Sequence, residues 1–210
     1  QENQHRFAAA LGAQPVWLNQ VHGADVVRLT GEQVQDGAPL PRADASICTE
    51  PGIACAVLVA DCLPVLLCSA DGRAVGAAHA GWRGLASGVL DRTVEALCGV
   101  AGNSPNELLA WLGPCIGPRA FEVGEDVLYA YGADPAFPDT TLFVPSPRPD
   151  GERRWRANLV GLARQRLAAL GVQQVSGGTW CTVEGGSRFF SYRREPRTGR
   201  LAAAIACRGH

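Results

Sequence analysis

The chain has 210 residues, of which 47% are hydrophobic and 19% are charged, a balance typical of a folded globular protein and unlike that of a disordered chain. Its 19 basic and 20 acidic residues give a formal net charge of −1, which excludes a basic field that attracts nucleic acid or a membrane surface. All of the basic residues are arginine, which excludes Schiff-base and P-loop lysine chemistry.

The predicted elements begin with a polar, helix-like stretch over residues 1–11. Because no initiator methionine precedes it, we expect an upstream segment to be missing. Short strands are predicted over residues 16–20, 25–29 and 44–48, with a loop over 30–42. Continuous apolar runs, typical of strands covered on both faces, occupy residues 53–60, 64–68 and 74–79. Asp71-Gly72 predicts a tight hairpin turn between the last two runs.

The second half alternates helices and strands. An apolar stripe predicts a helix over residues 84–100, and another amphipathic helix runs over 158–170, with Asn158 as its N-cap and Gly171 as its stop. We also expect a short helix over 124–131, an exposed loop over 135–155, and strands over 107–112, 172–175, 188–191 and 201–206. No repeat or linker divides the chain, so the pattern predicts a single α/β (α+β) domain over residues 1–210.

The eight cysteines indicate a cellular compartment. Most of them lie in apolar runs, such as Cys55 within residues 53–60 and Cys98 beside Leu97. Free cysteines behave in this way, as small hydrophobic residues of the core. We therefore predict reduced thiols and a cytoplasmic protein rather than four disulfides of a secreted one. No apolar run reaches the roughly 20 residues that a membrane span needs.

Two of the four histidines occupy positions suited to chemistry, whereas His5 and His210 lie near the chain ends. His22 ends a predicted strand, and His79 lies where a buried strand gives way to a helix, a junction at which α/β sheets build sites. Cys62 follows the apolar run 53–60. Because the predicted hairpin folds residues 64–68 against 74–79, we expect Cys62 and His79 to lie close together.

Two imidazoles and one thiolate, from His22, Cys62 and His79, form a familiar set of three zinc ligands with a fourth position open. Asp61 would orient a ligand imidazole or act as a base. Arg83, at a helix N-terminus, would favour an anion such as phosphate. Structural alternatives stay open: His22 as a hydrogen-bonded strand histidine, Cys62 as a buried thiol and Asp61 as a turn cap. Three further arginines would form a solvated charge cluster, namely Arg193, Arg194 and Arg200.

Several blocks of sequence carry a family resemblance. They are Gln20-Val21-His22-Gly23, residues 57–67 around Ala60-Asp61-Cys62-Leu63-Pro64, residues 77–84 with His79-Ala80-Gly81-Trp82-Arg83, residues 112–118 and 121–124, and residues 189–194 with 198–200. With these blocks the chain resembles the laccase-domain family, which is also called the multicopper polyphenol oxidase, peptidoglycan editing factor or purine nucleoside phosphorylase family.

The resemblance implies a layered α/β sandwich with a mixed sheet, similar to the catalytic domain of cytotoxic necrotizing factor toxins. It implies His22, Cys62 and His79 as catalytic zinc ligands. It also implies phosphorolysis of adenosine, inosine, guanosine and methylthioadenosine, with hydrolytic deamination of adenosine as a second reaction. Family members carry an upstream segment with Arg, Ser and Gly near the site, which we expect to be missing here, and Asn158 stands where Asp is common.

Three alternatives stay open. A copper polyphenol oxidase, which one family name suggests, would need more imidazoles than the two that are well placed, and the chain has no Met for a blue-copper axial ligand. A metal-free hydrolase would use Cys62 as nucleophile and His79 as base. The third is a cell-wall editing or scaffold role without catalysis. We predict foremost a zinc enzyme with purine nucleosides and phosphate as partners.

Overall fold

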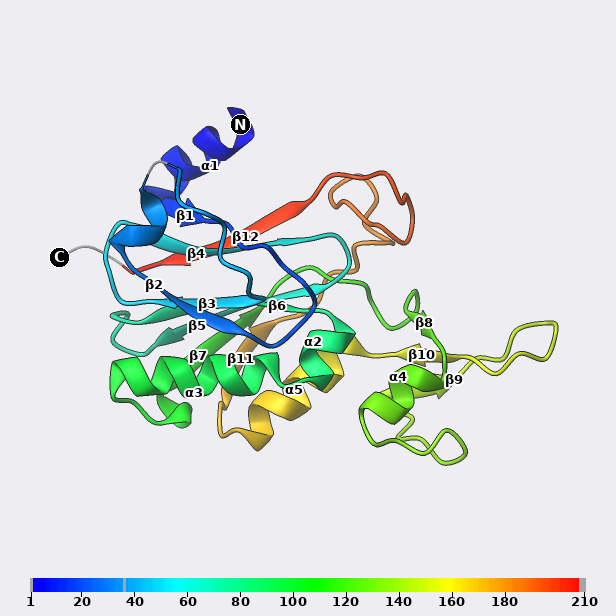
Figure 1. The fold of residues 1–210 in the computed structure, drawn as a ribbon. Helices are drawn as coiled ribbons and strands as arrows, with labels where there is room; N and C mark the ends of the chain where they lie inside the picture. Colours follow the sequence, from blue (N-terminus) through cyan, green and yellow to red (C-terminus); the bar gives the residue numbers. More distant parts are fainter. Residues whose placement is uncertain (1, 36, 208–210) are drawn as a thin grey trace.

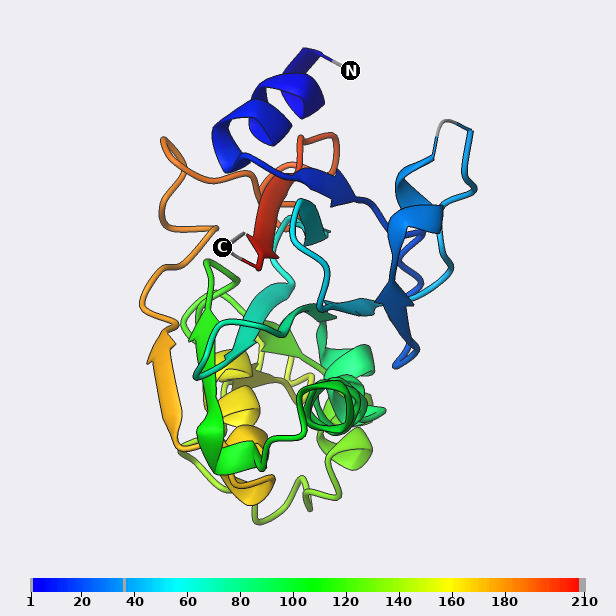
Figure 2. The ribbon, with the colours of Figure 1, turned by 90° about the vertical axis from the view of Figure 1, so that its left-hand side faces the viewer.

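The computed structural model describes residues 2–35 and 37–207, so His210 lies outside the described residues. The chain folds into three layers (Figure 1). A six-stranded sheet forms the middle layer, a three-stranded sheet covers one face, and helices α3 (Val89–Ala101) and α5 (Leu159–Ala169) cover the other. Figure 2 shows the same layers after a quarter turn, with α1 (Glu2–Leu11) beside the small sheet.

The large sheet has the order β11-β7-β5-β6-β3-β2. Its strands are β2 (Val26–Leu29), β3 (Ala45–Cys48), β5 (Leu63–Ser69), β6 (Val75–Ala80), β7 (Leu108–Leu112) and β11 (Gln174–Gly177). The pairs β2–β3 and β7–β11 are parallel and the others antiparallel, so the sheet is mixed. The predicted α/β class with a mixed sheet is confirmed.

Two smaller sheets complete the fold. The first has the order β1-β4-β12 and consists of β1 (Gln14–Val16), β4 (Ile53–Val59) and β12 (Leu201–Ala206). The second has the order β8-β10-β9 and consists of β8 (Glu122–Val123), β9 (Phe143–Pro145) and β10 (Trp155–Ala157). The remaining helices are α2 (Trp82–Ala86), α4 (Glu125–Ala130) and the 3-10 turns Gly31–Val34 and Pro105–Glu107.

The continuous apolar strands are buried on both faces, as predicted. In β6, Ala78 and Ala80 pack toward the helices, whereas Val75 and Ala77 pack toward the small sheet. Because side chains alternate along a strand, His79 shares its face with Val75 and Ala77. His79 therefore points into the layer between the two sheets, and only 3% of it is exposed.

The structure corrects four of the predicted elements. The strand predicted over 16–20 lies earlier, as β1, and residues 17–20 leave it. The helix predicted over 84–100 is two helices, because Gly88 adopts a left-handed φ of +88° between them. The loop predicted over 135–155 contains β9, which pairs with β10. No strand forms over residues 188–191, all of them described; the Phe189 carbonyl instead accepts a hydrogen bond from the Arg194 side chain.

Other sequence predictions agree with the structure. All eight cysteines lie among the described residues and are free thiols. Within the described part of the chain, no helix combines the length and apolar character that crossing a bilayer demands. Asn158 caps α5, as predicted, with its side-chain oxygen accepting the Gly161 N–H at 2.9 Å.

This cap gives a test of the fold. Asn158→Ala removes the acceptor at the start of α5, and we expect it to lower the free energy of unfolding by about 1 kcal/mol. Asn158→Asp is the matched control, because it keeps the acceptor and loses only the 3.3 Å bond from the amide to the Thr141 carbonyl. Urea denaturation measures both. Equal losses in the two variants would contradict a role for the cap.

Candidate metal centre

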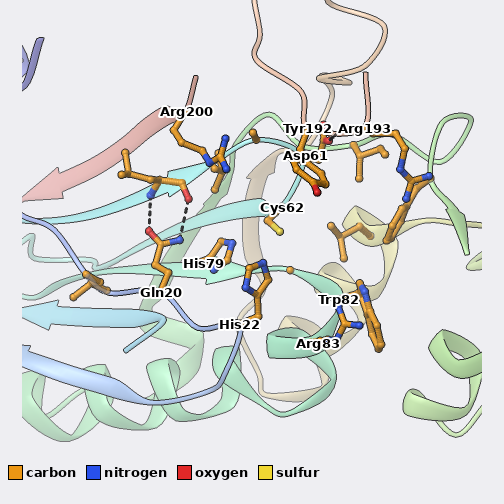
Figure 3. A pocket seen from close by; sticks show the side chains of 18 residues that line it. Gln20, His22, Asp61, Cys62, His79, Trp82, Arg83, Tyr192, Arg193 and Arg200 are labelled. Atoms are coloured by element: carbon orange, nitrogen blue, oxygen red, sulfur yellow. Dashed lines mark hydrogen bonds between the residues drawn. The ribbon is translucent and has the colours of Figure 1, made fainter. Parts of the chain in front are cut away.

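Two connecting loops and one strand bring the three predicted ligands together. His22 lies between β1 and β2, Cys62 between β4 and β5, and His79 in β6. Their possible ligand atoms all lie within 4.8 Å of one another, and the two imidazole rings meet edge to face with 4.8 Å between centroids (Figure 3). The predicted hairpin explains the approach, since its register pairs Leu63 with Ala80 and so places Cys62 beside the end of β6.

A glutamine that the sequence analysis did not single out holds the chain before His22. The Gln20 amide donates to the Leu58 carbonyl at 2.9 Å and accepts the Leu58 N–H at 2.8 Å. The side chain therefore pairs with β4 as a neighbouring strand would (Figure 3). Residues 17–20 therefore run alongside β4 without forming the predicted strand. The chain then turns toward the site at His22.

A buried aspartate, also missed, lies between the two histidines. The Asp44 carboxylate has no solvent exposure and accepts the backbone N–H groups of Val21, His22 and Gly23 at 2.7–3.1 Å. It also bonds Nδ1 of His79 at 2.8 Å. Burial alone would raise the pKa of Asp44, but these hydrogen bonds outweigh it and lower the pKa. The sequence signal that could have identified Asp44 is a charged residue directly before an apolar strand.

Asp61 does not take the position expected for an imidazole partner. Its oxygens accept the Thr182 hydroxyl at 2.6 Å and the Arg193 N–H at 2.7 Å, so the carboxylate bonded to His79 is Asp44 instead. Asp61 nevertheless lines the cavity beside Cys62. His22 and Asp61 have φ values of +61° and +94°, the positive values found among non-glycine residues in the described chain. Such strained backbone gathers at functional sites.

Two glycines allow the start of α2 to approach the ligands. A Cβ on Gly81 would lie 2.8 Å from the Cys62 sulfur, and one on Gly84 would lie 2.7 Å from the Gly23 carbonyl oxygen. Carbon atoms do not approach that closely, so any side chain at either position would displace a ligand-bearing segment. Arg83 is exposed in the first turn of this helix, with its guanidinium 4.3 Å from the centre of the Trp82 ring.

Contacts within the cluster shift the pKa values of Cys62 and His79. Burial would raise the pKa of Cys62, but hydrogen bonds and positive charge from His22 and His79 lower that pKa to about 7. Burial would likewise lower the pKa of His79, but the bonds to Asp44 and Cys62 raise it to about 9. Between these values the metal-free pair is a thiolate beside an imidazolium. A thiolate is the form of cysteine that binds metals and attacks electrophiles.

The cluster forms the floor of a cavity of about 570 Å³. Arg83 and Trp82 lie on one side of the cavity, and a C-terminal segment with Tyr192, Arg193 and Arg200 lies on another (Figure 3). Arg193 and Arg200 are thus part of the cavity wall and not simply solvated charges. Sequence reasoning did not select them for the site, because this segment follows the ligands by more than 100 residues.

Comparison with known proteins identifies the family. The sequence profile described as multi-copper polyphenol oxidoreductase laccase matches residues 1–208. The chain belongs to this family. The purine nucleoside phosphorylase YfiH of Escherichia coli (strain K12) is 49% identical over 207 residues, which cover 98% of this chain and 79% of that protein. A purine nucleoside phosphorylase of Pseudomonas aeruginosa is 50% identical over 205 residues, with the same two coverages.

Solved structures of family members confirm the fold. A crystal structure of a Neisseria meningitidis protein is 42% identical and aligns with a TM-score of 0.85 over 99% of this chain and 80% of the other. The crystal structure of YlmD from Geobacillus stearothermophilus is 30% identical, with a TM-score of 0.84 over 99% and 79% of the two chains. The predicted family and layered fold are therefore confirmed.

The thiol chemistry of the cluster is testable. In metal-free protein at pH 7 we expect iodoacetamide to modify Cys62 faster than Cys55 or Cys115, because burial raises the pKa of those two thiols to about 12. The Cys62 rate should fall as pH drops below about 7 and level off above it. Peptide mapping by mass spectrometry measures each rate. His79→Gln is the control, since losing the imidazole should slow Cys62 at pH 7. A rate that rises only near pH 9 would contradict the lowered pKa.

Proposed function

We propose that the protein is a zinc-dependent purine nucleoside phosphorylase that acts on adenosine, inosine, guanosine and methylthioadenosine, with adenosine deamination as a second reaction. The convergence of His22, Cys62 and His79 on the floor of a cavity carries this proposal. It is supported by relatives named purine nucleoside phosphorylase at 49% and 50% identity. The eight free cysteines support a reducing compartment, so we propose a cytoplasmic location.

The donor set fits zinc. Two imidazole nitrogens and a thiolate are typical ligands of catalytic zinc, and bond lengths of about 2.0–2.3 Å place such ligands about 3.3–3.8 Å apart. The three donor atoms, within 4.8 Å of one another, need only a small contraction to reach this spacing. A bound zinc ion would serve as a Lewis acid toward the substrate or toward water. Copper is the second candidate metal, because imidazole and thiolate also bind it.

The cavity suits a nucleoside. Its volume of about 570 Å³ lies within the range of roughly 300–1,000 Å³ that is usual for small-molecule sites. Apolar and aromatic side chains, among them Ile116, Phe121 and Tyr192, line it beside the polar cluster. Tyr192 is 57% exposed and offers an aromatic face to a planar base.

In phosphorolysis, a phosphate oxygen attacks C1′ of the ribose while the bond from C1′ to the purine nitrogen breaks. The base leaves with the electron pair of that bond and takes up a proton. We propose that Arg83 binds the phosphate, because its planar guanidinium matches two phosphate oxygens and lies at the edge of the cavity. Stacking on Trp82 would orient the guanidinium.

In deamination, water adds to the amino-bearing carbon of adenine and ammonia leaves. We propose that Asp61 accepts the proton of that water. It is the one carboxylate among the described residues lining the cavity, and it lies next to Cys62. Each of its oxygens accepts one hydrogen bond, from Thr182 or from Arg193, so each keeps a lone pair for a substrate proton.

The first test is the reaction itself. Full-length, zinc-loaded protein should release hypoxanthine from inosine in the presence of phosphate, and Cys62→Ser should lose both the zinc and the activity. Chromatography of the products, with elemental analysis of the protein, measures both. No hypoxanthine from the zinc-loaded protein would overturn the proposal. Activity that resists chelators but not alkylation would favour the metal-free hydrolase, and an intense visible copper band with polyphenol oxidation would favour the oxidase.

The second test concerns phosphate. Arg83→Gln should raise the KM for phosphate by about 10–100-fold, because a charge-assisted hydrogen bond contributes roughly 1.5–3 kcal/mol. The KM for inosine should change less. Arg92→Gln is the matched control, since Arg92 is an exposed arginine paired with Asp25 away from the cavity lining. Equal effects of the two substitutions on the phosphate KM would argue against Arg83 as the phosphate ligand.

A further inference from the structure

One buried carboxylate joins both histidines of the metal centre. Asp44 heads β3, and its backbone is tied to the site because the His79 N–H donates to the Asp44 carbonyl at 2.7 Å. Its Oδ1 accepts the His22 N–H at 2.9 Å and contacts His79 Nδ1 at 2.8 Å. Its Oδ2 accepts from Val21 at 3.1 Å and from Gly23 at 2.7 Å. Three backbone donors and one imidazole nitrogen therefore converge on one side chain that solvent does not reach.

These contacts determine which nitrogen of His79 carries the hydrogen. Three backbone N–H groups can only donate, so the Asp44 carboxylate acts as an acceptor toward all of its neighbours. His79 Nδ1 must then donate its hydrogen to Oδ1. In the neutral imidazole this leaves the lone pair on Nε2, which is the arrangement that a metal ligand requires.

The same carboxylate determines the backbone of His22. A φ of +61° is unfavourable for a residue with a Cβ and persists only where surrounding bonds compensate for it. Here the consecutive N–H groups of residues 21–23 point at one anion, as in the backbone nests that bind anions elsewhere. The strained turn aims the exposed His22 ring at Cys62 and His79.

We propose that Asp44 is the positioning residue of the metal centre, which holds His79 in the tautomer with Nε2 free and holds His22 in the turn that brings its ring to the site. This inference rests on the proposed metal site and adds a residue that touches neither metal nor substrate. Asp61, the neighbouring carboxylate, does not fill this role because its bonds go to Thr182 and Arg193.

Asp44→Asn is the informative variant. An amide has one oxygen and one NH₂ group where the carboxylate has two oxygens. In one orientation the NH₂ group faces the Val21 and Gly23 N–H groups, and in the other it faces the His22 N–H and turns His79 Nδ1 into an acceptor. We expect a loss of about 10–100-fold in zinc affinity, as is usual when the partner of a ligand histidine is replaced. Competition against a chromophoric zinc chelator at fixed pH measures it.

Asp61→Asn is the matched control for this affinity. It changes the other carboxylate of the site, so zinc affinity should stay near the wild-type value even where activity falls. Equal zinc affinity in wild type and Asp44→Asn would overturn the inference and leave the proposed function standing. Wild type that binds zinc but does not cleave inosine would overturn the proposed function alone. Wild type that binds no zinc would overturn both.

A second measurement does not depend on whether Asp44→Asn folds. In zinc-loaded wild-type protein, nitrogen-15 NMR should show a hydrogen on His79 Nδ1, shifted downfield by the bond to the Asp44 carboxylate, and none on Nε2. Where Asp44→Asn folds and binds zinc, that signal should move or vanish, a change that a general loss of stability would not produce. A hydrogen on Nε2 in the wild-type protein would overturn the inference.

Discussion

The site depends on one electrostatic requirement: the fully buried carboxylate of Asp44 must accept enough hydrogen bonds to remain charged. Asp44 meets it with three backbone N–H groups and one imidazole nitrogen. Removing any donor would leave an anion less compensated in a medium of low polarity, so the four contacts support one another. The loop that carries His22 and the strand that carries His79 are thereby fixed relative to each other, although 57 positions separate them in the sequence.

The sequence predicted the part of the site that local geometry determines. Cys62 and His79 meet because the short turn around Asp71-Gly72, over residues 70–73, sets the register of the β5–β6 hairpin, and hairpin register follows from turn type and apolar pattern. The burial of these strands on both faces was likewise predictable, since continuous apolar runs indicate covered strands, whereas the layered mixed sheet was implied by the family resemblance. Helix α5 could be predicted from its Asn158 cap and Gly171 stop.

Sequence patterns could not give the partners that depend on tertiary placement. Asp44 bonds His79 across 35 positions, and Asp61 bonds Thr182 and Arg193 across 121 and 132. Nothing local distinguishes which aspartate meets an imidazole, so the orienting role was expected at Asp61, beside Cys62, rather than at Asp44. Gln20 was missed for a related reason. The pattern predicted a strand over residues 16–20, whereas the Gln20 side chain, and not the backbone, pairs with Leu58.

The two aspartates divide the site between them. Asp44 connects the two histidines that would hold a metal, whereas Asp61 connects the Cys62 turn to the C-terminal segment that lines the cavity. Arg194 supports that segment by donating to the carbonyls of Thr182, Val183 and Phe189. The candidate metal ligands and the C-terminal wall of the cavity are thus held by separate hydrogen-bond networks that adjoin at the Asp61-Cys62 peptide. We therefore expect changes in this wall to alter what the cavity binds while the geometry of His22, Cys62 and His79 persists.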